Sequence, residues 1–247
     1  MDLSGKKILV TGATGSLGSE IAVKLSSLGA AVVVTGRNED KLNAVFSRLS
    51  GGGHEKYVAD ISNIEEIESM INQTAKSGKY SGLVHSAGFA AYKPLRMISR
   101  AFLESSMEIN FYAFIEIVKL ITKKQNFCEQ GGSIVAISSF ASDSGEMGQV
   151  AYSASKAAVD AAVRTLSFEL APKRIRINSI RPGVIKSESL ENLRNNSGDE
   201  NVQKVIGKQL LGIGKPDDVA NAAAFLISDY SVFTTGRYIY VDGGRFL

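Results

Sequence analysis

Short runs of β-branched and other apolar residues alternate along the chain with longer segments that have apolar residues at helical spacing. Ile8–Val10 and Ala31–Thr35 predict two buried strands. Glu20–Leu28, which lies between them, repeats apolar residues three and four positions apart and predicts a helix. A strand, a helix and a second strand in this order favour a parallel strand pair with a right-handed crossover.

The same alternation continues through the rest of the chain. It predicts an α/β fold of the Rossmann type, in which a doubly wound, seven-stranded parallel sheet carries helices on both faces. No linker rich in Pro, Ser or Gly divides the pattern, so we expect a single catalytic domain over residues 1–247. The further strands are expected at Tyr57–Ala59, Gly82–His85, Ser133–Ile137, Arg176–Ile180 and Tyr238–Val241, and the further helices at Ile64–Ala75, Phe102–Lys123, Ala154–Ala171 and Val219–Ile227.

One polar stretch interrupts this rhythm. Ser187–Gly207 has the sequence NNSGD at its centre, Asn195–Asp199. It follows a predicted strand, at the edge of the sheet where ligands of doubly wound folds bind. We therefore predict that residues 187–207 form a lid over the substrate.

Composition narrows the possible functions. The 247 residues carry a net charge of +3 and no run of Lys or Arg, which gives nucleic-acid binding no support. No apolar stretch approaches the roughly 20 residues that cross a bilayer, and the first residues lack the pattern of a secretory signal. Cys128 is the only cysteine, so no intramolecular disulfide can form. We expect a cytoplasmic protein and predict no metal site.

A glycine-rich loop joins the first predicted strand to the first helix. Glycines there allow the backbone to approach a pyrophosphate, and the following helix N-terminus offers free N–H groups to the anion. A turn without a ligand is the competing interpretation, but the position after the first strand of a βαβ unit argues against it. The loop residues expected to contact a dinucleotide are Gly12, Thr14, Gly15, Ser16, Leu17 and Gly18.

The end of the second predicted strand indicates which dinucleotide binds. No Asp or Glu lies between Val32 and Asn38, although a carboxylate there would bind the ribose hydroxyls of NAD. Arg37 instead offers the planar set of donors that suits a 2′-phosphate. We predict NADP(H); the alternative is that Arg37 is a solvated surface residue.

Residues after the third and fourth predicted strands also suit a dinucleotide. Asp60 and Ile61 are candidates for binding the adenine, although a helix cap near Ser62 explains Asp60 equally well. His85 is expected to be a structural, hydrogen-bonded residue, since no carboxylate partner is evident nearby. The small residues that let the backbone line the cofactor groove are Ser86, Ala87 and Gly88.

Tyr152 and Lys156 lie four residues apart in the sequence YSASK, so their side chains share one face of a predicted helix. A phenol is a poor base at neutral pH because its reference pKa is about 10. A neighbouring ammonium would lower the pKa of Tyr152 and allow the phenol to exchange a proton with an alcohol. The same spacing also occurs by chance on ordinary helix faces.

Two more polar residues are candidates for this site. Ser139 lies 13 positions before Tyr152, at the end of the fifth predicted strand, where its hydroxyl can orient a substrate carbonyl. Ser138 competes with it, because adjacent side chains on a strand point in opposite directions. Asn110 lies in a long apolar helix, where it is either a satisfied buried amide or the holder of a water that relays protons from Lys156.

With these residues in order, the whole chain resembles a compact short-chain dehydrogenase/reductase. The resemblance implies that Ser139, Tyr152 and Lys156 are catalytic, that Asn110 completes a proton relay, and that the enzyme interconverts ketones and secondary alcohols. It also implies a homo-oligomer, a tetramer or a dimer. The further cofactor contacts that it implies come from Tyr152, Lys156, Pro182, Gly183, Val184, Ile185 and Ser187.

The chain departs from the family pattern at several positions. The compact branch usually reads TGxxxGxG, whereas here Gly15 comes one position early and Ser16 stands at the middle Gly position. The resulting TGxxGxxG spacing is typical of the extended branch, for whose longer substrate domain this chain has no room. His85 and Ser86 replace the usual pair of Asn residues, and Ser187 replaces a common Thr but keeps the hydroxyl.

Among the members of this family, the chain most resembles 3-oxoacyl-[acyl-carrier-protein] reductases, with the segment GQVAYSASK at Gly148–Lys156. Lys173, Arg174 and Arg176 are candidates for meeting an acidic carrier protein, although a solvated basic helix end explains them as well. A keto-sugar or another small ketone is the alternative substrate. A non-enzymatic NADP(H)-binding sensor is the alternative function.

Overall fold

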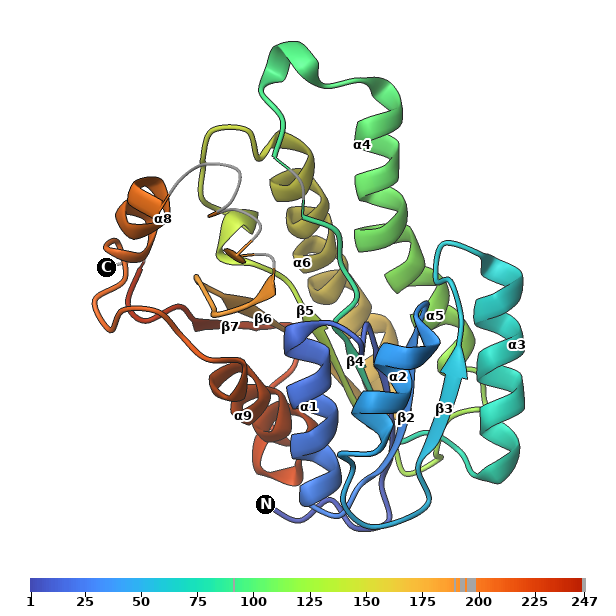
Figure 1. Ribbon diagram of the computed structural model, residues 1–247. Helices are drawn as coiled ribbons and strands as arrows, with labels where there is room; N and C mark the ends of the chain where they lie inside the picture. The colour runs from blue at the N-terminus through green and yellow to red at the C-terminus, as the bar shows by residue number, and fades with distance from the viewer. Residues whose placement is uncertain (91, 189, 192–193, 195–198, 246–247) are drawn as a thin grey trace.

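The computed structural model describes the chain except for residues 91, 189, 192–193, 195–198 and 246–247. The described residues contain one parallel sheet of seven strands in the order β3-β2-β1-β4-β5-β6-β7, which confirms the predicted fold class (Figure 1). The chain builds outward from β1 to β3 and then returns to place β4 on the other side of β1. The strands are β1 Lys7–Thr11, β2 Ala31–Gly36, β3 Glu55–Val58, β4 Gly82–His85, β5 Gly132–Ile137, β6 Ile175–Pro182 and β7 Tyr238–Val241.

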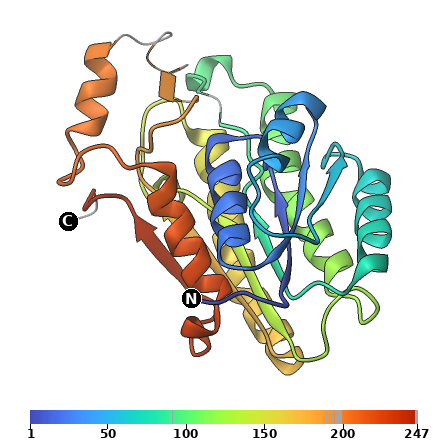
Figure 2. The same ribbon diagram turned by 60° about the horizontal axis from the view of Figure 1, so that its bottom comes forward.

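Helices pack on both faces of the sheet, and Figure 2 shows α9 beside α1 on one of them. On this face lie α1 Ser16–Ser27, α2 Glu39–Phe46 and α9 Pro216–Ile227. The opposite face carries α3 Ile64–Thr74, α5 Ala113–Ile121 and α6 Val150–Leu170. Two further helices, α4 Arg100–Met107 and α8 Asp199–Ile206, extend past the carboxyl ends of the strands (Figure 1).

The strand sequences explain why the sheet is buried on both faces. In β1, Leu9 belongs to the core beneath α3, α5 and α6, whereas Ile8 and Val10 belong to the core beneath α1, α2 and α9. Successive side chains of a strand point to opposite faces, so an uninterrupted apolar run supplies both cores. The register pairs Leu9 with Val33 of β2 and with Leu83 of β4, and all three side chains are fully buried.

The helices differ from the prediction at three places. The short helix α2 is absent from the predicted elements; Asn38 begins it by accepting a hydrogen bond from the backbone N–H of Lys41 at 2.8 Å. Helix α6 begins at Val150 rather than at Ala154, so Tyr152 lies within its first turn. The predicted long helix Phe102–Lys123 is divided by a π-helical segment, Glu108–Tyr112, which contains the fully buried Asn110.

The predicted lid falls partly outside the described residues: positions 189, 192–193 and 195–198 of the range 187–207 are not among them. Within the described part, Leu190 packs against Val184 and Val202 in a small apolar cluster separate from the two main cores. Helix α8 is therefore attached to the end of β6 by side-chain packing. In the part of the chain that the structure describes, no helix is both long and apolar enough to span a membrane.

A buried ion-pair network fixes the loop that follows β5. The guanidinium of Arg181, in β6, donates to Asp160 of α6 at 2.9 Å and also to Asp143 of the loop. Its Nη1 contacts the hydroxyl of Tyr240 at 2.7 Å, and the ring of Tyr238 lies 3.5 Å from its central carbon. The side chains of Arg181 and Asp160 are almost completely buried, so their interaction takes place at low dielectric. The network connects β6 and α6 and holds the loop after β5 between them.

We expect Asp160→Ala to lower the free energy of unfolding by about 3 kcal/mol or more, because it leaves a buried guanidinium short of a carboxylate. Asp217→Ala is the matched control: it removes an exposed partner 3.6 Å from Lys24, and we expect a loss of about 1 kcal/mol or less. Urea unfolding of both variants measures the difference. Equal losses of unfolding free energy in Asp160→Ala and Asp217→Ala would show that the buried network does not stabilise the protein more than an exposed ion pair does.

Candidate active site

The predicted site residues converge at the carboxyl ends of β1, β4, β5 and β6. In a doubly wound sheet, the strand order changes direction between β1 and β4, and the crevice there binds the ligand. The glycine-rich loop leaves β1, the segment Ser86–Gly88 leaves β4, and Ser139 follows β5. Pro182 ends β6 on the same edge. Residues from four distant parts of the sequence are therefore brought together by the parallel arrangement of the strands.

Two glycines of the first loop are required by close backbone approach. Gly12 has φ of +65°, and a Cβ there would lie 2.6 Å from the backbone of Ala87. Gly18 packs its Cα directly against the backbone of Gly12, which brings the first turn of α1 onto the end of β1. Gly15 is less constrained, because the nearest atom to a Cβ at that position would be the carbonyl oxygen of Gly12, at 3.4 Å.

The N-terminus of α1 fits a pyrophosphate. Gly15 precedes the helix without a side-chain cap, and the first turn carries no acidic residue. The first N–H groups of the helix therefore have no competing side-chain acceptor and point with the positive end of the helix dipole toward the loop. This cradle suits the diphosphate of a nicotinamide dinucleotide.

A pocket of about 310 Å³ beside this loop contains a cation that the sequence analysis did not single out. Lys41, in the first turn of α2, lines it together with Thr14, Gly15 and Ser16. Lys41 Nζ lies 3.4 Å from Glu188, whose backbone N–H donates to Ser16 Oγ at 3.3 Å. Only the unpredicted helix α2 brings Lys41 to the loop, which is why its position in the sequence gave no signal.

Arg37 and Asp60 lie at the adenosine end of the crevice. The guanidinium of Arg37 is largely exposed, and its Nη1 lies 3.9 Å from Asp60 Oδ2. Asp60 Oδ1 accepts hydrogen bonds from the backbone N–H and the hydroxyl of Ser62, and this backbone bond lowers the pKa of the carboxyl group. The alternative that Asp60 caps the helix near Ser62 is wrong, because Asn63 is the N-cap of α3 and the Asp60 carboxylate bonds to Ser62 in the turn before it. Ile61 belongs to the main core and exposes little surface to an adenine.

Tyr152 and Ser139 are hydrogen-bonded through their hydroxyl groups. Ser139 Oγ also accepts the backbone N–H of Ala141 at 3.1 Å, which fixes its orientation. Ser138, the competing candidate, points the other way and donates to the backbone carbonyl of Lys156 at 3.4 Å. The pleat of the strand end thus places Ser139 beside Tyr152 and directs Ser138 into the packing against α6.

Lys156 is buried under Tyr152. Its Nζ donates to the carbonyl of Ile137 at 2.8 Å and lies 5.9 Å from the centre of the Tyr152 ring. Gly88 makes room for it, since a Cβ at that position would lie 3.2 Å from Nζ. Burial lowers the pKa of Lys156 to about 8, although the charge of Asp160 opposes this shift.

The expectation that Lys156 lowers the pKa of Tyr152 is wrong for the protein chain by itself. Burial raises the pKa of Tyr152 to about 12, and the hydrogen bond from Ser139 opposes this only in part. Desolvation outweighs the ammonium because Nζ faces the ring and Ile137 rather than the phenol oxygen. Tyr152 is consequently a protonated phenol at neutral pH, ready to donate.

Asn110 uses its side chain entirely within the protein. Its Oδ1 accepts the backbone N–H of Phe89 at 2.7 Å, while its Nδ2 donates to the carbonyl of Phe89 at 3.0 Å and to Ser155 Oγ at 2.8 Å. The Asn110 amide therefore connects the segment after β4, at Phe89, with α6, at Ser155, next to Lys156. The interpretation of Asn110 as a satisfied buried amide is therefore confirmed, and the water for proton relay stays a prediction.

His85 is a structural residue, as its lack of a carboxylate partner predicted. The ring is buried, and its Nδ1 is hydrogen-bonded to Thr11 Oγ1 at 2.9 Å. Burial, together with the charge of Lys156, lowers the pKa of His85 to about 3. The imidazole is therefore neutral throughout the physiological range.

The segment that follows β6 is held by a residue outside the predicted set. The buried Gln209 accepts the backbone N–H of Val184 and donates to the carbonyl of the same residue at 3.3 Å. Lys186 donates its N–H to the carbonyl of Gly214 at 2.9 Å. These bonds fix Gly183–Ile185 at the crevice and lead the chain toward Ser187, which follows at its entrance.

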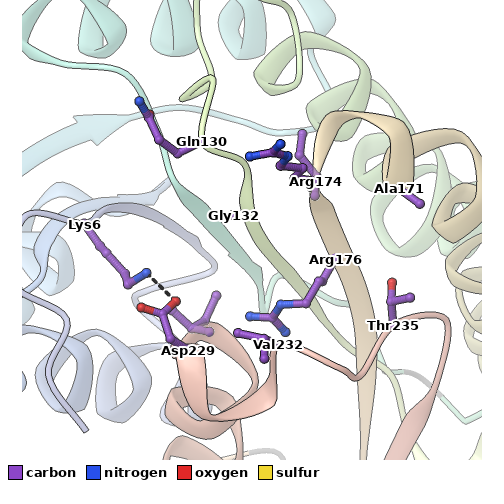
Figure 3. A pocket seen from close by; sticks show the side chains of 11 residues that line it. Lys6, Gln130, Gly132, Ala171, Arg174, Arg176, Asp229, Val232 and Thr235 are labelled. Atoms are coloured by element: carbon purple, nitrogen blue, oxygen red, sulfur yellow. Dashed lines mark hydrogen bonds and ion pairs between the residues drawn. The ribbon is translucent and has the colours of Figure 1, made fainter.

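The basic residues considered for carrier binding lie at the opposite edge of the sheet. Arg174 and Arg176 line a cavity of about 400 Å³ where β5 and β6 begin (Figure 3). Arg176 donates to the carbonyls of Leu226 at 2.9 Å and Ser228 at 3.0 Å, at the end of α9. Lys6, also in this cavity, is paired with Asp229 at 2.8 Å. Arg176 is therefore held by the fold, whereas Lys173 and Arg174 are exposed. Since β6 runs for roughly 23 Å from there to the crevice, these residues do not border the candidate active site of their own chain, and carrier binding stays a prediction.

Sequence comparison identifies the family. Residues 12–245 match a family model described as enoyl-(acyl carrier protein) reductase. The chain is 35% identical to the 3-oxoacyl-[acyl-carrier-protein] reductase FabG of Rickettsia felis, an alignment that covers 100% of this chain and 99% of that protein. It is 32% identical to the 7alpha-hydroxysteroid dehydrogenase of Escherichia coli (strain K12), with 98% and 94% covered.

Solved structures agree. A dehydrogenase/reductase from Sinorhizobium meliloti 1021 superposes with a TM-score of 0.92 at 30% identity, covering 100% of this chain and 97% of that one. An actinorhodin polyketide ketoreductase solved with NADPH gives 0.91 at 26% identity, covering 97% of both chains. The chain belongs to the short-chain dehydrogenase/reductase family and is an oxidoreductase of the kind that acts on CH–OH groups. Within that family, its similarity to 3-oxoacyl-[acyl-carrier-protein] reductases extends over the full chain.

We expect the stability of the protein to fall as the pH falls from about 6.5 to about 3, because the unfolded chain protonates His85 in this range and the folded chain does not. The slope due to one such group is at most about 1.4 kcal/mol per pH unit. His85→Asn should flatten the slope, whatever it does to stability at pH 7. Urea unfolding at several pH values compares the two slopes; parallel curves would rule out His85 as their cause.

Proposed function

We propose that this protein is an NADP(H)-dependent reductase that interconverts a ketone and a secondary alcohol, with 3-oxoacyl thioesters as its preferred substrates. The observation that carries the proposal is the partly buried, protonated Tyr152, hydrogen-bonded to Ser139 and lying over the buried Lys156 at the carboxyl edge of the sheet. A phenol in this position can give its proton to a carbonyl oxygen. Ser139 presents a second hydroxyl to the same oxygen.

The proton path follows from these contacts. The cofactor, when bound, exchanges the hydride with the carbonyl carbon. Ser139 orients the carbonyl oxygen and Tyr152 protonates it as negative charge develops. Lys156, with a pKa of about 8, readily holds or releases a proton near neutral pH and stands between Tyr152 and the Asn110 region. A water held by the main chain at Asn110 would resupply the proton.

The residues at the other end of the crevice support NADP(H). The cradle of Gly12, Thr14, Gly15, Ser16, Leu17 and Gly18 receives the diphosphate, and Ser86, Ala87 and Gly88 form the wall beside the ribose and nicotinamide. Pro182, Gly183, Ile185 and Ser187 close the crevice from β6. Arg37 is exposed and Lys41 lies beside the loop, so two cations are available to a 2′-phosphate. Both an NADPH and an NADH complex occur among similar structures, so these cations are the argument for NADP(H).

The full-length similarity to 3-oxoacyl-[acyl-carrier-protein] reductases supports a 3-oxoacyl thioester as substrate. The similarity to a 7alpha-hydroxysteroid dehydrogenase makes another carbonyl compound the second candidate. We further propose that residues 1–247 act as one catalytic domain, that residues 187–207 cover the substrate, and that the protein works in the cytoplasm as a tetramer or dimer. A sensor without activity is disfavoured, since Ser139, Tyr152 and Lys156 are assembled in contact.

We expect the protein to oxidise NADPH with a 3-oxoacyl thioester faster than with a keto-sugar, a 7-oxosteroid or a 2-enoyl thioester, as followed by NADPH absorbance. Tyr152→Phe should lower kcat by about 10²–10⁴-fold because the proton donor is lost, while NADPH still binds. Tyr230→Phe, an exposed tyrosine at the amino edge of the sheet, is the matched control. Near-normal turnover in Tyr152→Phe would overturn the proposal, and cofactor binding with no turnover on any substrate would favour the sensor.

Arg37→Ala should raise the Kd for NADPH by about tenfold or more, the loss of one charged hydrogen bond to phosphate, and leave the Kd for NADH nearly unchanged. Arg164→Ala, an exposed arginine on the surface of α6, should change neither value. Titration of both cofactors by calorimetry, for the unaltered protein and the two variants, measures the six constants. An equal effect on both cofactors would show that Arg37 does not recognise the 2′-phosphate.

A further inference from the structure

Two loops meet beside Tyr152 and form a wall that the proposed mechanism does not use. The backbone N–H of Lys93, in the segment that leaves β4, donates to the carbonyl of Gly148 at 2.9 Å. Gly148 has φ of +81°, a conformation that glycine adopts without strain, and directs the loop into α6. This bond brings Tyr92 next to Gln149, the residue that precedes α6 and lies three positions before Tyr152.

Gln149 is almost completely buried, although it has a long polar side chain. Its carboxamide is hydrogen-bonded to the phenol of Tyr92, and this bond opposes the rise in the pKa of Tyr92 that burial causes. A bond that favours the phenolate is one in which the phenol oxygen accepts, so Gln149 donates and the hydroxyl proton of Tyr92 stays available. Among the described residues, Gln149 Oε1 has no hydrogen-bond partner, so the amide is not fully satisfied within the protein.

The phenol of Tyr92 is accessible and near the reacting group. About half of the Tyr92 side chain is exposed, at 48%, in contrast to the buried Gln149 behind it. If the phenol of Tyr92 lost its proton, the negative charge would raise the pKa of Tyr152. The two phenols therefore lie near each other. Tyr92 is therefore a neutral, half-exposed phenol near Tyr152, which allows both hydroxyls to act on one substrate.

The charged groups around this wall have other contacts, and the ammonium of Lys93 lies 4.4 Å from the centre of the Phe102 ring. Glu146 is paired with Arg245 and lies 3.3 Å from Lys208. The guanidinium of Arg245 also donates to the carbonyl of Val205 at 2.9 Å and lies 4.1 Å from the ring of Phe140. The Glu146 carboxylate is thereby engaged by two cations, so a substrate oxygen can take the hydrogen bond of the Tyr92 hydroxyl.

We propose that Tyr92 is a specificity-determining residue: positioned by Gln149, it donates a hydrogen bond to a second oxygen of the substrate, close to the ketone that Ser139 and Tyr152 hold. The site would then prefer 1,3-dicarbonyl compounds, such as 3-oxoacyl thioesters, over simple ketones. This inference rests on the proposed ketone reduction and adds to it a structural basis for substrate choice. Tyr92 would contact the substrate, and Gln149 would act only through Tyr92.

The test compares two probes of equal chain length, ethyl 3-oxobutanoate and 2-heptanone, which differ in whether a second carbonyl is present. For each variant, the ratio of kcat/KM for the first probe to that for the second is measured with NADPH, so that general effects on folding and cofactor binding cancel. We expect Tyr92→Phe to lower this ratio about three- to tenfold, as the loss of one hydrogen bond implies. Tyr230→Phe, an exposed tyrosine at the amino edge of the sheet, is the matched control and should not change it.

The role of Gln149 has its own readout. Gln149→Met keeps the size of the side chain but removes the donor, and we expect it to lower the ratio as Tyr92→Phe does. The double variant should lower it no further, because both changes remove the same interaction. A ratio that Tyr92→Phe leaves unchanged, or losses that add in the double variant, would overturn the inference while leaving ketone reduction intact. If the unaltered protein reduces neither probe nor a 3-oxoacyl thioester, the proposed function itself fails.

Discussion

The burial of one ammonium group is the constraint on which the site depends. Lys156 Nζ has a single carbonyl as its hydrogen-bond acceptor among the described residues, that of Ile137 at the end of β5, and it lies beneath the Tyr152 ring. A charge in such a place is stable only with compensation nearby. Asp160, one helical turn further along α6, raises the pKa of Lys156 and is itself held by Arg181. The network that fixes the loop after β5 thus also supports the charge on Lys156.

The glycine pattern of the first loop has a physical explanation in the same crevice. Gly12 and Gly18 are constrained by backbone approach, whereas Gly15 has ordinary space around it. The departure from the common TGxxxGxG pattern therefore falls at a position where the structure tolerates change. Ser16 begins α1, and its hydroxyl accepts the N–H of Glu188, which connects the phosphate loop to the segment after β6.

The sequence was sufficient for the features that depend on periodicity and chain order. The apolar runs predicted the seven strands, and the parallel arrangement then required Ser139, Tyr152 and the glycine-rich loop to meet at one edge. The choice between Ser138 and Ser139 needed coordinates, because it depends on the phase of the pleat at the strand end. The π-helical segment at Asn110 and the short helix α2 arise from tertiary packing, which local propensity does not encode.

Electrostatic properties were the least accessible to sequence. The spacing of Tyr152 and Lys156 correctly placed both on one face of α6, but the pKa of the phenol rises because burial outweighs the ammonium. Tyr92 had no recognisable motif, since its position depends on the bond between Lys93 and Gly148, which are 55 positions apart. Such effects follow from three-dimensional proximity and desolvation, neither of which is visible in residue order.

The pairing of Glu146 with Arg245 has a consequence for biosynthesis. The two residues are 99 positions apart, and Arg245 is among the last that the structure describes. Translation delivers β1, α1 and the glycine-rich loop well before Arg245, and a domain generally folds as a unit. The ion pair between Glu146 and Arg245 can form only after β7 and the residues that follow it have been synthesised. A chain that stops before Arg245 thus contains the residues of the phosphate cradle but lacks one contact of the wall beside Tyr152.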